Sequence, residues 1–364
     1  MRRESFVSQV IEQRPENGPG ERPRALNPES FAELAISRWE IRLRATQAAV
    51  LPTFSGSTLR GTFGHALKQT VCVMNHGDCG RCLVADKCIY PYVFETPAPP
   101  DLPILRNQKD APHPFILDPP LDEAPLGPPR EQSRRLAAGD EMVFGLTLMG
   151  RAIEYMPYLI YAVHEMARRG LGQGRATFEL SEVSALDAAG ERRVIYTESS
   201  QRLDGAGGDA LDLSQLIAAR LARSLEAGSR GREIDSLRLR FITPTRIKTR
   251  DDLQPQADFA LLIRSLLRRI SMLLAVHGRQ PLELDFRGLL ERAAAVRTGF
   301  SSLRWRDWTR YSSRQQTKMQ LGGFIGEVVF EGSGLGDCWP LLIAGEILRV
   351  GNGTSFGLGR YELL

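Results

Sequence analysis

The sequence predicts an α+β protein built from two tandem ferredoxin-like (RRM-like) domains, with a metal-binding loop inserted in the first. Two observations support this fold class. A repeat recurs at a spacing of 183 residues in a chain of 364. Each half also shows the same succession of a strand, a helix, further strands, a second helix and a last strand.

The repeat joins an apolar helical stretch to a glycine loop and a short strand, over residues 157–180 and again over residues 340–363. The two segments align without a gap. Repetition at half the chain length indicates two copies of one domain rather than a solenoid. Identical residues stand at seven pairs of positions: Pro157 and Pro340, Leu159 and Leu342, Ile160 and Ile343, Gly170 and Gly353, Gly174 and Gly357, Glu179 and Glu362, Leu180 and Leu363.

The elements of the first half follow from hydrophobic periodicity and capping. Residues 36–51 alternate as a strand, with Trp39, Ile41 and Leu43 on one face. Ser57 is expected to cap a helix that runs to about residue 72. The remaining expected elements are strands at 90–94, 115–117 and 141–149, a helix at 156–168 and a last strand at 176–183.

The second half repeats this order. Leu237, Leu239 and Phe241 alternate with arginines in a strand over residues 236–243. The elements that follow are a helix at 258–276, strands near 323–330, a helix from 340 and a final strand from 360. We therefore predict a flexible N-terminal tail at 1–30, a first domain at 31–200 and a second domain at 201–364. A proline-rich loop at 96–135 holds 11 of the 22 prolines and interrupts the first domain.

The composition is that of a globular protein, with 42% hydrophobic and 25% charged residues. No apolar run approaches the ~18 residues that span a bilayer, so we expect no membrane contact. Arg2 and Arg3 are not followed by an apolar segment, so we expect no signal peptide and a cytoplasmic location.

Basic residues concentrate in one region. Residues 220–320 hold 21 lysines and arginines against 10 acidic residues, whereas the remainder of the chain is net acidic. Arginine supplies nearly all of this charge, and its planar guanidinium bonds phosphate oxygens in pairs and stacks on bases. A basic half beside an acidic half indicates a polyanionic partner such as a nucleic acid.

Four of the five cysteines fall within 17 residues, in the spacing C-x6-C-x2-C-x5-C: Cys72, Cys79, Cys82 and Cys88. In a chain without an export signal, such a cluster predicts a metal site rather than disulfides. Four thiolates suit tetrahedral, structural Zn2+, with an iron–sulfur cluster as the alternative. His76 could replace one thiol, and Cys338 is expected to be a plain buried residue.

Several ordered motifs resemble the CRISPR-associated pre-crRNA-processing endoribonucleases of the RAMP superfamily. The resemblance covers roughly residues 35–364 and leaves out the N-terminal tail and the proline-rich loop. In the first half it rests on residues 59–67 and the cysteine cluster that follows them. In the second half it rests on residues 241–246, 266–269, 308–315, 322–326 and 351–363.

The resemblance implies two ferredoxin-like domains and a glycine-rich loop, residues 351–359, that contacts CRISPR repeat RNA. It implies an endoribonuclease without a catalytic metal, in which the 2′-hydroxyl attacks the adjacent phosphate and leaves a 2′,3′-cyclic phosphate. The product is a crRNA that is handed to, or kept within, the subunits of a CRISPR interference complex.

The family usually places a histidine on or near the first helix of the first domain, and His65 matches that location. Histidine suits both proton transfers because its ordinary pKa lies near neutrality. Lys68 lies three residues further on and could stabilise the developing anion, and Arg60 is a second cationic candidate. Tyr311, Ser312 and Arg314 are rivals for a catalytic role, although RNA binding suits them better.

The candidate RNA-binding residues lie in the second half. Trp305, Trp308 and Tyr311 alternate with arginines, a composition typical of base stacking combined with phosphate contacts. Backbone N–H groups of a glycine loop can also approach a phosphate closely. The full set is Arg246, Lys248, Arg310, Tyr311, Arg314, Gly351, Gly353, Ser355, Gly357, Gly359 and Arg360.

Three functions remain open from the sequence. An RNA-cleaving enzyme is favoured by His65 with Lys68. A non-catalytic RAMP-type subunit that binds crRNA would use the same fold, basic half and glycine loops. A metal-dependent nuclease is disfavoured because the sequence shows no cluster of carboxylates suited to a two-metal centre.

Overall fold

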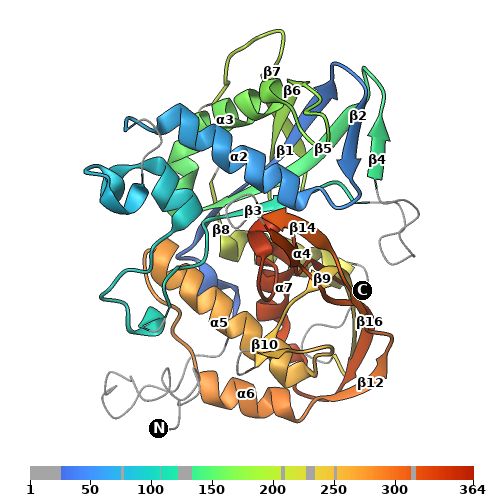
Figure 1. Cartoon of the computed structure of the whole chain (residues 1–364). Coiled ribbons are helices and arrows are strands. Elements are labelled where there is room, and N and C mark those ends of the chain that lie inside the picture. Colours follow the sequence, from blue (N-terminus) through green and yellow to red (C-terminus); the bar gives the residue numbers. More distant parts are fainter. Residues whose placement is uncertain are drawn as a thin grey trace.

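The structure is a computed structural model that describes residues 26–74, 78–106, 108–121, 133–205, 210–226, 234–249, 252–312 and 317–364. For residues 225–226, 309–312 and 317–320 it describes the backbone alone. The two halves of the chain form two antiparallel sheets, which lie one above the other in Figure 1, blue to green above yellow to red.

The first sheet has the strand order β3-β5-β1-β6-β7. Helices α2 (Gly56–Val71) and α3 (Met156–Arg169) pack on one of its faces, and their apolar residues share one core with those of the strands. The strands are β1 (Ala35–Ala45), β3 (Phe115–Asp118), β5 (Glu141–Met149), β6 (Phe178–Leu186) and β7 (Arg192–Thr197), and the short β8 (Leu211–Asp212) pairs with β1.

The second sheet has the strand order β12-β16-β9-β17, with β13 also paired to β16. Its strands are β9 (Ser236–Thr245), β12 (Arg297–Ser301), β13 (Arg304–Arg306), β16 (Gly323–Glu331) and β17 (Tyr361–Leu363). Its apolar residues share a core with helices α4 (Leu213–Glu226), α5 (Phe259–His277), α6 (Phe286–Ala294) and α7 (Trp339–Leu348).

Three two-stranded sheets complete the described strands. They are β2 (Ala49–Pro52) with β4 (Ser133–Leu136), β10 (Lys248–Thr249) with β11 (Asp252–Leu253), and β14 (Thr309–Ser312) with β15 (Thr317–Gln320). The hairpin β14–β15 carries part of the aromatic and arginine segment that the sequence singles out.

Local sequence accounts for the main elements. In β1, Trp39, Ile41 and Leu43 are buried while the alternate residues point to the opposite face. Asp258 caps α5, because its side-chain Oδ1 accepts a hydrogen bond from the backbone N–H of Leu261 at 2.7 Å. Helix α7 is apolar nearly all round, which is the composition of a helix buried within a core.

The internal repeat is confirmed by the structure. Helices α3 and α7 begin at Met156 and Trp339, and strands β6 and β17 begin at Phe178 and Tyr361, so both pairs keep the spacing of 183 residues. The glycines of the two loops share positive φ angles, such as +83° at Gly174 and +85° at the equivalent Gly357.

The two sheets also share one connectivity. In each, the strand that follows the second helix pairs with the first strand, and the strand before the second helix lies on the other side of the first. The strand that follows the helices after the first strand lies at the edge of the sheet, next to the strand that precedes the second helix of the repeat. This mixed architecture with antiparallel sheets is consistent with the tandem ferredoxin-like arrangement.

Some expected elements were wrong. The expected strand at 90–94 is a turn of π-helix, Pro91–Glu95, which begins at a proline suited to the first helical turn. A short aromatic and apolar run does not by itself distinguish strand from helix. The expected strand at 36–51 is divided between β1 and β2, and helices α4 and α6 were not expected.

Among the residues that the structure describes, no helix combines the length and the apolar character that crossing a membrane requires.

Candidate active site

Helix α2 carries all three predicted catalytic residues and lies where the two halves meet. The prediction that Ser57 caps this helix was wrong, because the helix begins at Gly56 and Ser57 lies within its first turn, whereas Cys72 follows the helix end as expected. His65 is exposed, whereas Arg60 and Lys68 are half-buried. The side chain of His65 is therefore open to solvent, whereas Arg60 and Lys68 contact other parts of the protein.

Lys68 lies at the cysteine loop. Its Nζ stands 5.2 Å from the centre of the Tyr90 ring, and it lines a cavity together with the four clustered cysteines. Burial raises the pKa of the Cys79 thiol, Glu95 adds to this effect, and nearby Lys68 opposes it. The predicted anion-stabilising lysine thus belongs to the surroundings of the cysteines as well as to the helix that carries His65.

Arg60 lies at the junction of the two halves. Its Nε donates to Ser355 Oγ at 3.0 Å, and its Nη2 is 3.0 Å from His113 Nε2. Its guanidinium carbon stands 4.5 Å from the centre of the Phe356 ring and 5.4 Å from that of Phe94. A predicted catalytic residue and a predicted RNA-binding residue therefore meet directly.

Two histidines flank this junction, of which His113 is half-buried and His277 is buried. Burial lowers the pKa of His113 to about 3, and the nearby positive charge of Arg60 adds to the effect. Burial also lowers the pKa of His277 to about 4, although its hydrogen bond to the carbonyl of Pro112 opposes the shift. Both imidazoles are therefore neutral at neutral pH. His277 is the last residue of α5 and is buried where α5 meets Pro112 of the first half.

The glycine-rich loop at 351–359 is packed between the two halves. Gly351 has φ +79°, and a Cβ there would lie 2.5 Å from the carbonyl oxygen of Arg246. Gly357 has φ +85°, and a Cβ there would lie 2.4 Å from Cδ of Pro119. Ser355, Gly357 and Gly359 are buried, so the exposed part of the loop is at Asn352.

The remaining cations of the predicted RNA-binding set differ in exposure. Arg246 is half-buried, its pKa is lowered by burial, and its Nη1 donates to the carbonyl of Gly322 at 2.6 Å. Lys248 is exposed on β10. Arg360 lines a cavity of 520 Å³ between the halves, and burial lowers its pKa. Arg246 and Arg360 therefore help to hold the site together, whereas Lys248 faces solvent.

The base of the hairpin β14–β15 lies next to the start of α2. Trp308, directly before β14, stacks on Phe54 with the ring centres 3.7 Å apart. The backbone of Arg310 and Tyr311 lies in β14, and Arg314 is outside the described residues. The hairpin base, the glycine-rich loop and the start of α2 are thus brought together from segments almost 300 residues apart in sequence.

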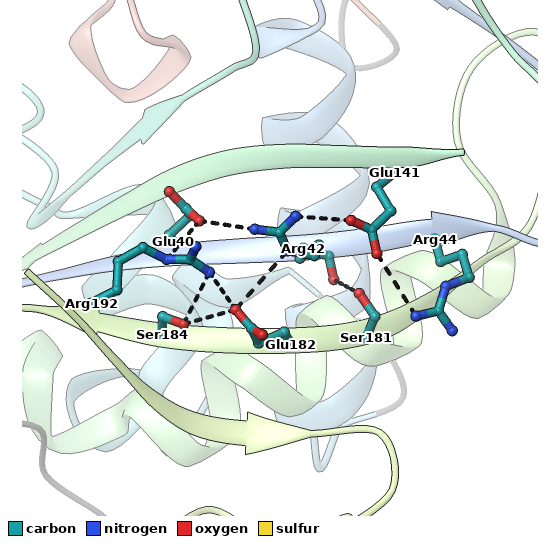
Figure 2. Close-up of polar contacts among 8 residues, drawn as sticks. All are labelled: Glu40, Arg42, Arg44, Glu141, Ser181, Glu182, Ser184 and Arg192. Carbon is teal, nitrogen blue, oxygen red and sulfur yellow. Dashed lines mark hydrogen bonds and ion pairs between the residues drawn. The ribbon is translucent and has the colours of Figure 1, made fainter. Parts of the chain in front are cut away.

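The face of the first sheet that points away from α2 and α3 carries paired charges (Figure 2). Arg42 Nη1 lies 2.8 Å from Glu141 Oε2, and Arg192 Nε lies 3.1 Å from Glu40 Oε1. Arg192 also pairs with Glu182. Because each of these arginines is matched by a carboxylate, this face offers little net attraction to a phosphate chain.

The four clustered cysteines line one cavity of 330 Å³, and all four are free thiols. Their donor chemistry fits zinc. Across the described ranges, however, no three His, Cys, Asp or Glu side chains are placed so that they could hold a metal ion, and His76 lies outside these ranges. Zinc is therefore not supported by the structure and stays a prediction. The fifth cysteine, Cys338, is buried in the second core, as expected.

Sequence reasoning missed the residues that complete the junction. His113 was assigned to the proline-rich loop, and neither Thr96 nor Phe94 was considered. No local signal could have found them, because His113 lies 53 residues from Arg60 and Ser355 lies 295 residues from it.

Comparison with known protein families finds a match in the second half of the chain. Residues 239–361 match the family model of the CRISPR-associated endoribonuclease Cas6. This match lies within the second half of the chain. The first half, residues 34–206, matches a separate family model described as an N-terminal domain, AF_1859_N. The resemblance inferred from sequence motifs is therefore confirmed.

Known relatives share this arrangement over nearly the whole chain. An uncharacterized protein of Archaeoglobus fulgidus is 23% identical over 337 residues, which cover 91% of this chain and 98% of that protein. The structure of a Thermus thermophilus Cas6 product complex (TTHB231) is 18% identical, covering 91% of this chain and 99% of that one with a TM-score of 0.50. A chain of a partial Cas6-RT-Cas1–Cas2 complex is 16% identical, with a TM-score of 0.54 over 92% of this chain and 46% of that one. The Cas6 fold therefore spans both halves.

Proposed function

We propose that this protein is an endoribonuclease that cuts CRISPR repeat RNA, converting pre-crRNA to crRNA. The match to the Cas6 family model at 239–361 supports the substrate class. The observation that carries the proposal for this chain is the position of His65. It is exposed on α2, whose first turns contact both the glycine-rich loop and Phe54, the partner of Trp308 at the hairpin base.

In the proposed reaction a base removes the proton of the 2′-hydroxyl, and the oxygen attacks the adjacent phosphorus. The bond from phosphorus to the 5′-oxygen breaks, and an acid protonates that oxygen. The products are a 2′,3′-cyclic phosphate and a 5′-hydroxyl. His65 serves as one of the two proton-transfer groups, and no step uses a metal ion.

Cations complete the proposed site. Lys68 lies one turn after His65 and is a candidate to stabilise the phosphorane charge. Lys248 on β10, together with Arg310 and Tyr311 of β14, is proposed to bind the RNA. Arg60 is already engaged with Ser355 and His113, which makes direct contact with the reacting phosphate the less suitable role for it.

We also propose that each half is a ferredoxin-like domain. The order of four strands that the two sheets share, β3-β5-β1-β6 and β12-β16-β9-β17, and the repeat of helix, glycine loop and strand support this assignment. The crRNA product is proposed to pass to subunits of an interference complex. A solved Cas6-containing chain assembled with Cas1 and Cas2 supports the idea that such domains work within larger complexes.

The test is cleavage of the organism's own repeat RNA in EDTA by the wild-type protein, His65→Ala and His164→Ala. His164 is a partly exposed histidine on α3 and serves as the matched control. We expect His65→Ala to slow single-turnover cleavage by about 100-fold or more while RNA binding persists, and His164→Ala to cut normally. Binding without cutting by the wild type would instead support a non-catalytic crRNA-binding subunit. Cutting only with added metal would refute the metal-independent mechanism.

A further inference from the structure

Arg60 lies in a polar chain that crosses from one half of the protein to the other. Its guanidinium is held among the rings of Phe94, Phe115 and Phe356, at 5.4, 5.9 and 4.5 Å from the ring centres. Phe94 and Phe115 belong to the first half and Phe356 to the glycine-rich loop of the second. Stacking on rings of both halves suits the delocalised charge of arginine better than the compact charge of lysine.

The hydrogen bonds of this chain have a fixed direction. Arginine has donors only, so His113 Nε2 must accept the bond from Arg60 Nη2. The proton of the neutral imidazole then lies on Nδ1 and is donated to Thr96 Oγ1, 2.9 Å away. The Thr96 hydroxyl in turn donates to the carbonyl of Tyr92 at 3.1 Å. The chain therefore runs from Ser355 through Arg60 and His113 to the π-helical turn that follows the cysteine loop.

The backbones also meet closely at this junction. A Cβ at Gly56, the first residue of α2, would lie 2.0 Å from the carbonyl oxygen of Phe356. The glycine-rich loop therefore rests against the beginning of the helix, and Arg60 fixes it there through Ser355. His65 lies five residues further along the same helix.

We infer that Arg60 is a positioning residue, which holds the glycine-rich loop against α2 so that RNA bound at the loop is presented to His65. This role rests on the proposed function, because it concerns the alignment of the RNA with the proposed catalytic histidine. In this role Arg60 does not contact the reacting phosphate itself. A small displacement of a bound reactant lowers the rate of its reaction strongly, even when every reacting group is intact.

Three variants test whether Arg60 positions the RNA or takes part in the cleavage reaction itself. Ser355→Ala removes one acceptor with little change of volume, and Arg60→Lys keeps the charge without the planar fork. The double variant tests whether the two residues act together. Arg168→Ala is the matched control, since Arg168 is exposed on α3 and pairs with Glu165 within its own helix.

We expect Ser355→Ala and Arg60→Lys each to lower the single-turnover rate at saturating repeat RNA about tenfold. The pH dependence of the rate should keep its shape, because the proton-transfer groups are unchanged. The double variant should be no slower than the slower single variant. A multiplied loss in the double variant, or an altered pH profile, would overturn the positioning role.

Amide hydrogen exchange tests the same inference without any cleavage. Amides of the loop at 351–359 should exchange about tenfold or more faster in Ser355→Ala and Arg60→Lys than in the wild type and Arg168→Ala. Unchanged exchange in the loop would overturn the inference even if the variants cut slowly. A wild-type protein that does not cut would refute the proposed function, while the exchange result would still decide whether Arg60 holds the loop.

Discussion

At the scale of single residues, two histidines bear on acid stability. His113 and His277 have pKa values of about 3 and about 4 in the folded protein, below the ordinary value of 6.5. Below pH 6.5 the unfolded chain therefore binds protons that the folded protein does not, so stability falls with falling pH. The full contribution is present above about pH 6.5 and is lost as the pH approaches the folded values.

We predict that His113→Gln makes thermal unfolding less sensitive to pH between 7 and 4.5. Glutamine can still accept from Arg60 but does not titrate. At pH 4.5 the wild type loses about 3 kcal/mol for each such histidine, because this pH lies two units below the unfolded pKa and above the folded one. Melting temperatures across this range provide the measurement, with His164→Gln as the control. An equal slope in wild type and His113→Gln would contradict the prediction.

Two glycines of α2 give a second residue-scale prediction. A Cβ at Gly56 would lie 2.0 Å from a backbone oxygen of the glycine-rich loop, whereas a Cβ at Gly61 would meet no atom within 4 Å. Gly56→Ala should therefore destabilise the protein by about 1–3 kcal/mol, because backbone must move. Gly61→Ala should stabilise it by about 0.5–1 kcal/mol, since alanine favours the helix. Chemical denaturation measures both, and equal effects would argue against close packing of the loop on α2.

At the scale of elements, the cysteine loop joins the end of α2 to the π-helical turn. Cys72 directly follows the helix, and Cys88 lies just before Tyr90 and Pro91. All four cysteines line the cavity that also contains Lys68. A structural metal ion held there would fix the end of the helix that carries His65.

We predict about one zinc ion per chain in protein purified without chelator, measured by elemental analysis. Cys79→Ala should lose the metal and lower the melting temperature, whereas Cys338→Ala should retain it, since Cys338 lies in the other core. Bound iron with visible absorption would favour the iron–sulfur alternative. A metal content that is equal in the wild type and Cys79→Ala would refute the predicted site.

The elements also show where sequence reasoning succeeds. Helices α3 and α5 were placed within two residues of their ends, because long amphipathic periodicity with a cap or glycine at the boundary is a strong local signal. The π-helical turn was taken for a strand because a short apolar run has no clear period. The hairpin β14–β15 was recognised only as an aromatic and arginine composition, since its placement beside α2 depends on the contact of Trp308 with Phe54.

At the scale of the whole molecule, charge is divided unequally between the halves. The net charge is only +4, yet residues 220–320 carry 21 basic against 10 acidic residues. The open face of the first sheet pairs its arginines with carboxylates, as at Arg42 and Glu141 (Figure 2). Phosphate contacts are therefore expected mainly from the second half.

We predict that affinity for repeat RNA falls as salt rises, with a slope of about −0.7 for each phosphate that is neutralised on a single strand. Lys248→Ala should make the slope shallower by about 0.7, because Lys248 is exposed on β10. Lys109→Ala, an exposed lysine of the first half, is the control and should leave the slope unchanged. Binding that barely weakens between low and high salt would exclude a phosphate-dominated interface.

The two halves meet both through shared apolar packing and through specific polar contacts, since Ile36, Ile116 and Met149 of the first half lie in the same core cluster as residues of the second half. Arg349 of the second half pairs with Asp118 of the first at 2.5 Å. Arg60 of the first half donates a hydrogen bond to Ser355 of the second. Such pairs add directional contacts to the apolar packing that joins the two halves. The placement of the glycine-rich loop beside α2 is a consequence of this docking.

The sequence by itself determined the repeat, the two-domain plan, the family motifs and the helix that carries His65, because periodicity, capping and motif spacing are local properties of the chain. Tertiary structure alone decided which contacts the predicted site residues make. Arg60 and Ser355 are 295 residues apart, and only docking of the two halves makes them hydrogen-bond partners. Lys68 lines the cavity of the cysteine loop, whose lining residues all lie between positions 68 and 91, yet the folded path of that loop, which motif spacing does not record, decides this placement.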